Sequence, residues 1–436
     1  MWLRLSTNAS VIHGRVMQTG HVFLVFAFGM AGCGGRSSLS DLDWSLVDGG
    51  STSGTYPAGP STRAKPDAGS PVGSDAAVTP QCTSWQGSIG APVALTDTSE
   101  DSMLTGFAVE SSRVFVATVT SGPTWRVRAV SDDLSSLGAQ NVVLRGTRRT
   151  WYYGGLSVAA QYGRRGSLAW NDADGCRFVS LAQDGSPSAK PVTVGDNICF
   201  WLSATPTGFD AIESSSNWDA PYERVSLSDV GTVAQRKELV PARNGSTYPR
   251  GHAAFDDASM MLAWSSSGSV LIQRYSSAGE KISAAESLLA YRRDLDFALT
   301  SVGSAALAAW ISDYTDGNLM VQSLGKDATT GRPAVVGTPG GSRVMSIGAA
   351  GTGALVAWVN PNENNSGYTL AIQPVTKAGA LEGTVMTVPI RTANVVRIRV
   401  LGTPSGAMLL YEGEDTTLRN PRVQVFAIRV KCTTPH

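Results

Sequence analysis

Residues 82–436 carry short runs in which apolar and polar positions alternate, separated by turns rich in Gly, Ser and Asp. Alternation with a period of two places every second side chain on one face of a strand. Beyond position 35, the chain lacks a sustained apolar spacing of three and four, which an amphipathic helix would require. With 47 Gly and only 16% charged residues, the composition also favours strands and tight turns over long surface helices. The sequence predicts an all-β protein.

One phrase recurs along this part of the chain. It is a short apolar run that ends in Trp, and its four clear copies end at Trp170, Trp264, Trp310 and Trp358. A polar turn follows, then a second apolar run, which ends in Gln in three copies, at Gln273, Gln322 and Gln373. A Gly-bearing turn comes next, at Gly279, Gly325 and Gly379. Such recurrence indicates one supersecondary unit that is used repeatedly.

Weaker copies fill the gaps and bring the repeat to seven units. Their anchor residues, 43 to 53 positions apart, are Thr118, Trp170, Glu213, Trp264, Trp310, Trp358 and Tyr411. Seven units of about 49 residues, each with about four short strands, predict a seven-bladed β-propeller. A pair of β-sandwiches is the competing all-β architecture, but it does not require one phrase at a steady period. Six or eight blades are the alternative counts.

The two ends of the repeat region complete each other. The last unit stops at residues 423–430 and lacks its outer strand, while residues 90–96 match the pattern of an outer strand. An N-terminal strand that completes the last blade would close the ring. Cys82 and Cys432 flank these two strands and predict one disulfide, and Cys176 with Cys199, on neighbouring strands, predicts a second. Free buried thiols are the alternative for these four cysteines.

The fifth cysteine, Cys33, directly follows an apolar run over residues 21–32. This run is too short to span a bilayer, which takes about 20 residues, and has the length of a signal-peptide core. Met30-Ala31-Gly32-Cys33 resembles the lipobox of bacterial lipoproteins, although leucine is usual at the position of Met30. The resemblance implies a signal peptide at 1–32, a lipid on Cys33 that binds the membrane and, because Gly34 rather than Asp follows, a favoured location at the outer membrane. An ordinary secretory signal is the alternative.

A stalk separates this anchor from the repeats. Of the 48 residues from Gly34 to Gln81, 8 are Gly, 9 are Ser and 5 are Pro, and apolar residues show no pattern. Such a segment cannot bury enough apolar surface to offset the entropy of ordering it. The expected organisation is therefore a signal peptide at 1–32, a lipidated Cys with a disordered stalk at 33–81, and a β-propeller domain at 82–436.

Charge and histidine content exclude several kinds of chemistry. The 35 basic and 35 acidic residues balance, which argues against nucleic-acid binding. Among four histidines only His252 lies inside the repeats, where we expect a structural role, so neither a Ser-His-Asp group nor a histidine metal site is expected. Acidic turns at 172–175, 313–317 and 412–415 are compatible with calcium, but none has the full alternating ligand series, and turn formation is the favoured explanation. We expect no catalytic residues, no metal and no cofactor.

Loops between successive blades are rich in Arg and aromatic residues. Guanidinium groups bind carboxylate or phosphate, and flat rings stack on sugar faces. The alternative is that these arginines pair with acidic turns or stay solvated. The candidate ligand-binding rim consists of Arg148, Arg149, Tyr152, Tyr248, Arg250, Tyr291, Arg292 and Arg293.

These features together indicate a lipid-anchored envelope protein that displays a non-enzymatic binding module for a protein or an envelope polysaccharide. They resemble bacterial lipoproteins that carry repeat propellers. The alternative function is a secreted hydrolase or lyase that acts on polysaccharide, because propellers host such enzymes and fold does not fix function. An assembly scaffold is a third possibility and would need a large apolar patch.

Overall fold

The computed structural model describes most of the repeat region. Described are residues 85–432 apart from gaps at 86–88, 111, 123, 146–157, 163–164, 173–174, 206, 215–220, 242–247, 256, 267–268, 291–295, 313–316, 326–330, 341, 343, 362–366 and 391. The predicted lipid site at Cys33, the signal peptide and the stalk lie outside the described residues. Within these residues, no helix is long and apolar enough to cross a membrane.

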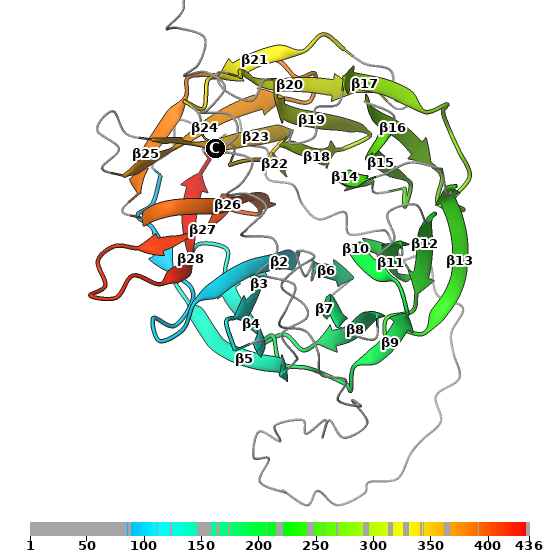
Figure 1. Cartoon of the computed structure of the whole chain (residues 1–436), viewed down its shortest axis with the longest axis horizontal. Coiled ribbons are helices and arrows are strands. Elements are labelled where there is room, and N and C mark those ends of the chain that lie inside the picture. The colour runs from blue at the N-terminus through cyan, green and yellow to red at the C-terminus, as the bar shows by residue number, and fades with distance from the viewer. Residues whose placement is uncertain are drawn as a thin grey trace, which may run out of the picture. The chain divides into compact units, whose positions relative to one another are not determined.

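The described strands form seven antiparallel sheets of four strands each (Figure 1). The first three are β2 (Ser102–Glu110), β3 (Arg113–Thr120), β4 (Thr124–Ser131) and β5 (Leu137–Arg145); β6 (Val158–Tyr162), β7 (Arg165–Asp172), β8 (Gly175–Leu181) and β9 (Val192–Gly195); and β10 (Ile198–Thr205), β11 (Gly208–Ser214), β12 (Tyr222–Leu227) and β13 (Val233–Val240).

The next three sheets repeat this order, and the last one includes the first strand of the chain. They are β14 (Tyr248–Ala254), β15 (Met260–Ser266), β16 (Ser269–Tyr275) and β17 (Glu286–Ala290); β18 (Phe297–Val302), β19 (Ala305–Ile311), β20 (Leu319–Leu324) and β21 (Ala334–Gly337); β22 (Met345–Ala350), β23 (Gly353–Pro361), β24 (Tyr368–Thr376) and β25 (Met386–Ile390); and β26 (Thr392–Thr403), β27 (Gly406–Asp415), β28 (Val423–Lys431) and β1 (Val93–Ala94).

The first strand of each consecutive sheet is the innermost one. β2, β6, β10, β14, β18, β22 and β26 contact one another in this order, and β26 contacts β2. Figure 1 shows the sheets radiating from this inner ring. The prediction of an all-β propeller is confirmed. Each of the seven anchor residues of the repeat lies in the second strand of a different sheet.

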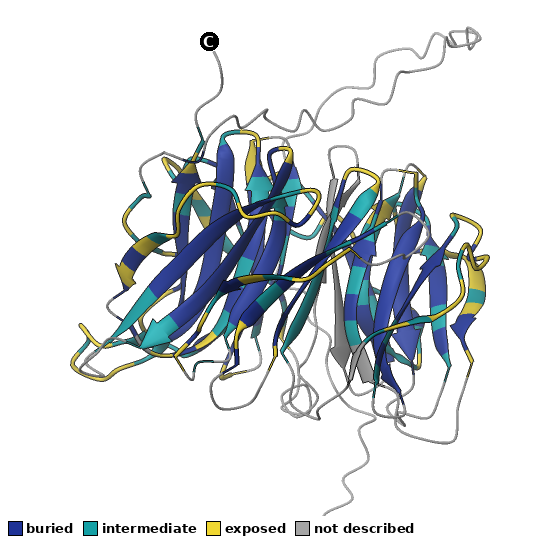
Figure 2. Ribbon diagram, turned by 90° about the horizontal axis from the view of Figure 1, so that it is seen from above, coloured by how far each residue is buried: buried dark blue, intermediate teal, exposed yellow. Residues whose placement is uncertain are grey.

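The second strands are buried on both faces, which explains the apolar phrase of the repeat. All seven residues of β11 and all seven of β15 are buried. A strand covered on both sides reads as a near-continuous apolar run rather than as an alternating one. Figure 2 shows buried residues along most of the strands and exposed ones mainly at the loops and at the edge of the molecule. The core therefore consists of layers between neighbouring sheets.

The Gln and Gly of the repeat also have structural roles. The buried Gln side chains close the segment after the third strand: Nε2 of Gln273 donates to the Ser283 carbonyl at 2.6 Å, and Gln322 and Gln373 donate likewise to Gly331 and Glu382. The Gly turns pack against the preceding sheet. Gly231 has a φ of +85°, and a Cβ there would lie 2.5 Å from the Phe178 ring.

The first and last segments of the described chain lie side by side. β1 pairs with β28, with Val93 opposite Ala427 and Ala94 opposite Phe426. Just beyond β1, the Thr96 hydroxyl donates to the Gln424 side chain at 2.9 Å and accepts from the Val425 amide at 3.1 Å. These contacts join residues more than 300 positions apart and tie the start of the ring to its end.

The disulfide predicted between Cys176 and Cys199 is confirmed. It joins β8 to β10 in neighbouring sheets, with the two Cα atoms 5.5 Å apart. Cys432 is also disulfide-bonded. Cys82, its predicted partner, lies outside the described residues, so that pairing stays a prediction.

Candidate functional site

A cavity of about 380 Å³ lies among the inner strands β2, β10, β14 and β18. Its polar side chains are Ser203, His252, Thr300 and Ser301, and Ala, Val and Leu supply the remainder of the lining. The innermost strand of a sheet has one edge without a strand partner, so backbone donors and acceptors also face this region. The cavity therefore combines small apolar surfaces with neutral hydrogen-bonding groups, which is the usual composition of a small-molecule site.

His252 is the central polar side chain of this cavity. It lies on β14, half-buried, with its Nε2 atom 3.4 Å from Oγ of Ser203 on the neighbouring strand β10. Its ring stacks on Trp201, with centroids 5.7 Å apart and planes inclined by 22°. The Nδ1 atom lies at nearly the same distance from this hydroxyl, 3.5 Å, so the contacts place the imidazole beside a hydroxyl group that either ring nitrogen can reach.

The imidazole is neutral at physiological pH. Burial is the main cause that lowers the pKa of His252 from 6.5 to about 4, and the charge of Arg224 lowers it further. A neutral imidazole offers one donor and one acceptor to a ligand. The side chain thus adds hydrogen-bonding capacity to the cavity without adding charge.

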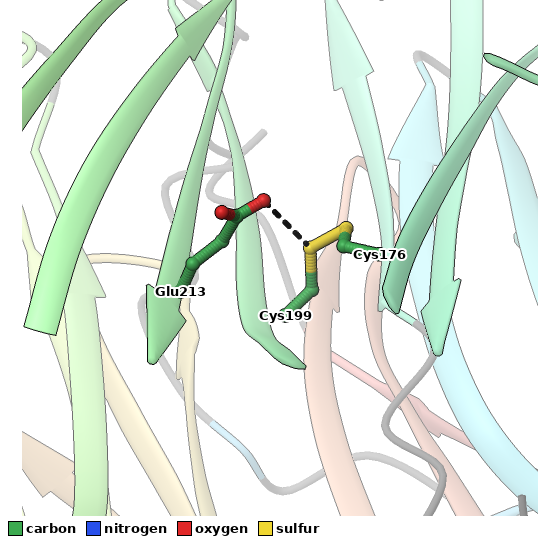
Figure 3. A group of neighbouring side chains, drawn as sticks. All are labelled: Cys176, Cys199 and Glu213. Carbon is green, nitrogen blue, oxygen red and sulfur yellow. Dashed lines mark hydrogen bonds between the residues drawn. A yellow bond between two sulfur atoms is a disulfide. The ribbon is translucent and has the colours of Figure 1, made fainter. Parts of the chain in front are cut away.

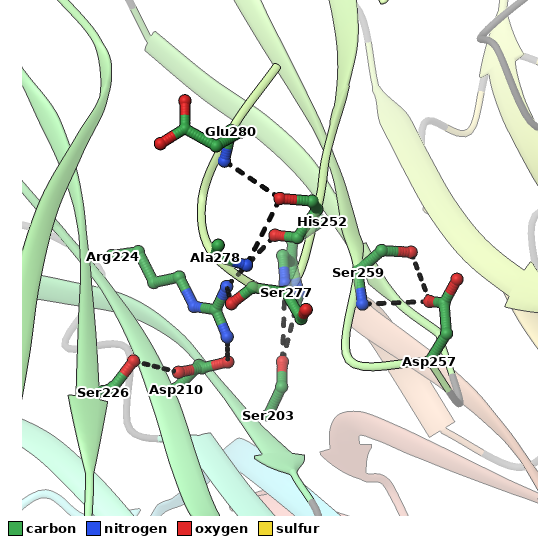
Figure 4. Close-up of polar contacts among 11 residues, drawn as sticks. Ser203, Asp210, Arg224, Ser226, His252, Asp257, Ser259, Ser277, Ala278 and Glu280 are labelled. Carbon is green, nitrogen blue, oxygen red and sulfur yellow. Dashed lines mark hydrogen bonds and ion pairs between the residues drawn. The ribbon is translucent and has the colours of Figure 1, made fainter. Parts of the chain in front are cut away.

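Arg224 belongs to a buried network behind His252 (Figure 4). It pairs with Asp210, which also accepts a hydrogen bond from Ser226 at 2.8 Å. The same guanidinium donates to the backbone carbonyls of Ser276 and Ser277 in the next sheet. Removing either charge would leave the other buried without its partner, which is strongly destabilising. We therefore assign this network a structural role between two sheets.

A second cluster combines Cys176, Cys199 and Glu213 (Figure 3). One potential ligand atom from each residue lies within 4.8 Å of the others, and all three residues are buried. The two sulfur atoms are bonded to each other, however, so neither offers a thiolate to a metal ion. Glu213 instead accepts a hydrogen bond from Arg236 at 2.8 Å, and burial raises the pKa of its carboxyl group. This cluster links sheets and is not assigned to the site.

The predicted rim is largely outside the described residues. Of its eight members, Arg148, Arg149, Tyr152, Tyr291, Arg292 and Arg293 are in gaps. Tyr248 begins β14, and its side chain is not described. Arg250 lies two residues further along β14, is half-buried, and makes contacts within the protein. The rim as a ligand-binding surface stays a prediction.

The acidic turn at 412–415 has protein partners for each of its carboxylates. Glu412 is buried and accepts from the Leu104 amide at 2.9 Å, which ties β27 to β2. Glu414 accepts from Asn394, and Asp415 accepts from the amide and hydroxyl of Thr417. These bonds match turn formation and sheet contact. In the other two acidic turns, the acidic side chains are not described, and only Gly175 and Gly317 are.

Three of the polar residues that line the cavity occupy equivalent positions in successive repeats. Ser203, His252 and Ser301 are 49 residues apart in sequence, which is the mean period of the repeat. Equivalent positions of successive units lie at the same height on successive inner strands. A search for chemical side chains at this one phase of the repeat would have brought these residues together, whereas His252 considered alone suggested only a structural role.

No protein-family model and no curated protein matches the chain. Among solved structures, a polysaccharide lyase of the PL25 family, ulvan lyase, is 7% identical, with a TM-score of 0.50 over 79% of this chain and 94% of that chain. Virginiamycin B lyase from Staphylococcus aureus is 13% identical, with a TM-score of 0.49 over 78% of this chain and 98% of that chain. The β-propeller domain of Myceliophteria thermophila Cps50 is 12% identical, with a TM-score of 0.47 over 79% of this chain and 100% of that domain. At these identities the similarity shows the propeller fold alone.

Proposed function

We propose that this chain is a lipid-anchored protein of the bacterial cell envelope whose propeller binds a polar ligand, without chemical conversion, in the cavity among its inner strands. The observation that carries the proposal is the cavity of about 380 Å³ with Ser203, His252 and Thr300 in its lining. Its volume and its mixture of hydroxyl, imidazole and apolar groups suit a saccharide unit or a peptide side chain. The ligand class is therefore an envelope polysaccharide or a protein.

The chemistry of the cavity favours binding over catalysis. A general base is most effective when its pKa lies near the operating pH, and a pKa of about 4 makes His252 a weak base at neutral pH. Glycoside hydrolysis usually requires two carboxyl groups about 5–9.5 Å apart. None of the described residues that line the cavity is a carboxylate.

The envelope location rests on the N-terminal sequence. A signal peptide at 1–32, a lipid on Cys33 and a stalk to residue 81 would hold the propeller away from the outer membrane. A disulfide between Cys82 and Cys432 would fasten the start of a seven-bladed ring to its end, beside the paired strands β1 and β28. A covalent link across so long a loop would stabilise the ring by constraining the unfolded chain.

The alternative function is cleavage of a polysaccharide by a hydrolase or lyase. It is supported by the position of His252, since a neutral imidazole in a cavity is a potential proton acceptor. The two functions differ in one observable, because only an enzyme shortens the polysaccharide that it binds.

A glycan panel tests the proposal. The purified protein is titrated with acidic and neutral oligosaccharides, and each mixture is analysed for new chain ends. Ala204 is exposed and lines the cavity, so Ala204→Trp fills the site without disturbing the core. Ala284, which is exposed before the outer strand β17, provides the matched control Ala284→Trp.

We expect binding that Ala204→Trp abolishes, that Ala284→Trp retains and that produces no new ends. New chain ends would favour the enzyme. Binding unaffected by Ala204→Trp would show that the cavity is not the site.

A further inference from the structure

The innermost strand of the closing sheet, β26, carries two arginines on one face. Arg397 and Arg399 alternate with Ile398 and Val400, which are buried in the core shared with β22 to β24. In a strand, successive side chains point to opposite faces. Both arginines therefore face away from that core and toward β2, the neighbouring inner strand.

The two arginines differ in their partners. Arg397 donates to the Leu104 carbonyl on β2 and lies 3.9 Å from the Glu412 carboxylate. Arg399 donates to the carbonyl of Ile398, its own neighbour, at 2.8 Å. Among the described residues it forms no salt bridge. A guanidinium group has five N–H donors, so most of the hydrogen-bonding capacity of Arg399 is unused.

Arg399 is also partly removed from solvent. Burial, reinforced by repulsion from Arg397, lowers the pKa of Arg399 from 12.5 to about 10, so the group is still charged at neutral pH. The attraction of Glu412, a carboxylate that Arg399 shares with Arg397, opposes this shift only in part, so the charge of Arg399 is incompletely balanced in the free protein. Such a group gains most when a ligand brings the missing negative charge.

The inner strands run in the same direction, and their contacts give the height of Arg399 in the ring. Gly402 packs against Ala349 on β22, and the Ala349 amide donates to Thr300, a cavity residue, at 3.1 Å. On the other side, Arg397 donates to the Leu104 carbonyl of β2, four residues before Ala108, another cavity residue.

The contacts of Gly402 place the end of β26 near the level of the cavity. Arg399 precedes that level by two residues, which is about 6.6 Å along a strand. An arginine side chain released from the Ile398 carbonyl is long enough to span such a distance.

We propose that Arg399 binds a carboxylate of the ligand, so that the cavity selects acidic sugars or acidic peptide side chains over neutral ones. The inference rests on the proposed function and specifies its ligand class. A guanidinium fork matches a carboxylate in geometry, and a charge-assisted pair is about twice as strong as a neutral hydrogen bond. His252, Ser203 and Thr300 then contact the neutral part of the ligand, for which uncharged donors and acceptors suffice.

Two sugars that differ in one carboxylate provide the test. D-Glucuronate and D-glucose are titrated calorimetrically into the purified wild-type protein and into Arg399→Gln, Arg399→Lys and Arg422→Gln. Arg422 is exposed in part and contacts Asp101 at 3.4 Å just before the start of β2, whereas the cavity residues Ala108 and Val109 lie at the end of that strand, so its variant controls for the loss of one positive charge.

We expect wild-type protein to prefer glucuronate and Arg399→Gln to lose affinity for glucuronate by about tenfold or more, with the affinity for glucose unchanged. Arg399→Lys keeps the charge but not the fork and should fall between them, and Arg422→Gln should match wild type. Because Glu412 keeps Arg397 as its partner and the repulsion between the two arginines is removed, the unfolding midpoint of Arg399→Gln should not fall below that of wild type.

Two results would overturn the inference. Equal affinity of wild type and Arg399→Gln for glucuronate would remove the role of this side chain, while any binding blocked by Ala204→Trp would leave the proposed function standing. Failure of wild type to bind glucuronate would reject the acidic ligand class, and the glycan panel would still decide the proposed function by itself.

Discussion

Gly231 offers a quantitative test of how the repeat turns fit between sheets. It lies in the turn before β13 with a φ of +85°, and a Cβ at this position would lie 2.5 Å from both the Phe178 ring and Cγ2 of Val192. Phe178 is fully buried and has no free space into which to move. Gly231→Ala therefore incurs a conformational cost of about 1–2 kcal/mol for a left-handed non-glycine residue. Overpacking against the ring adds about 1–3 kcal/mol.

The variant Gly303→Ala separates the conformational contribution from the overpacking contribution. Gly303 has a φ of +59°, but a Cβ there would meet nothing within 4 Å. Gly303→Ala should therefore lower the free energy of unfolding by the conformational cost alone, about 1–2 kcal/mol. The effect of alanine on the unfolded chain is shared by both variants and cancels in the comparison.

Urea unfolding of wild type, Gly231→Ala and Gly303→Ala measures the difference directly. We expect Gly231→Ala to be less stable than Gly303→Ala by about 1–3 kcal/mol. Phe178→Leu should reduce this excess, because a smaller side chain leaves room for the methyl group, and the double-mutant cycle should show the coupling. Equal losses for the two glycine variants, or no coupling with Phe178, would refute the claim that this turn packs tightly on the preceding sheet.

Three further predictions follow from the same contacts. Replacing both Cys176 and Cys199 by Ala should lower the free energy of unfolding, measured in urea, by about 3 kcal/mol according to the chain-entropy model for a loop of this size. Stability equal to that of wild type would show that the disulfide does not constrain the unfolded chain. Thr96→Val should lower the free energy of unfolding by about 1–3 kcal/mol, because it leaves the Val425 amide and the Gln424 side chain without their shared partner. Thr96→Ser keeps the hydroxyl and should retain most of the stability. Similar losses for the two variants would contradict the role of the hydroxyl. His252 should titrate near pH 4 in NMR spectra, and a midpoint near 6.5 would exclude the buried neutral imidazole. Because the folded pKa lies below the unfolded value of 6.5, the stability that the neutral form contributes should be present above about pH 6.5 and lost as the pH falls toward 4. His252→Gln should lack this dependence of stability on pH.

The propeller could be predicted from the sequence because its repeat is a packing requirement. The second strands whose side chains are described are buried on both sides, so the apolar run, which ends in Trp in its four clear copies, recurs where two sheets meet. Gln273 and Gly279 recur with it because a buried carbonyl needs a donor and a tight turn needs a left-handed residue. Pairing of Cys176 with Cys199 followed from neighbouring strands.

The candidate site could not be predicted in the same way. Ser203, His252 and Thr300 lie on different sheets, and small polar residues on an inner strand carry no local signature of a cavity. The arginine-rich loops drew attention because their composition is unusual, whereas Arg399 lies within an ordinary strand pattern. Its significance depends on sharing the single carboxylate of Glu412 with Arg397, which only the packing of β26 and β27 against β2 defines.

A crystal structure of the protein with an acidic oligosaccharide from the glycan panel tests the central claim most directly. The account predicts a saccharide unit among β2, β10, β14 and β18, with hydrogen bonds to Ser203 and His252 and a carboxylate on Arg399. A saccharide bound only at the loops around Arg148 and Arg292, with the cavity free of ligand, would contradict it.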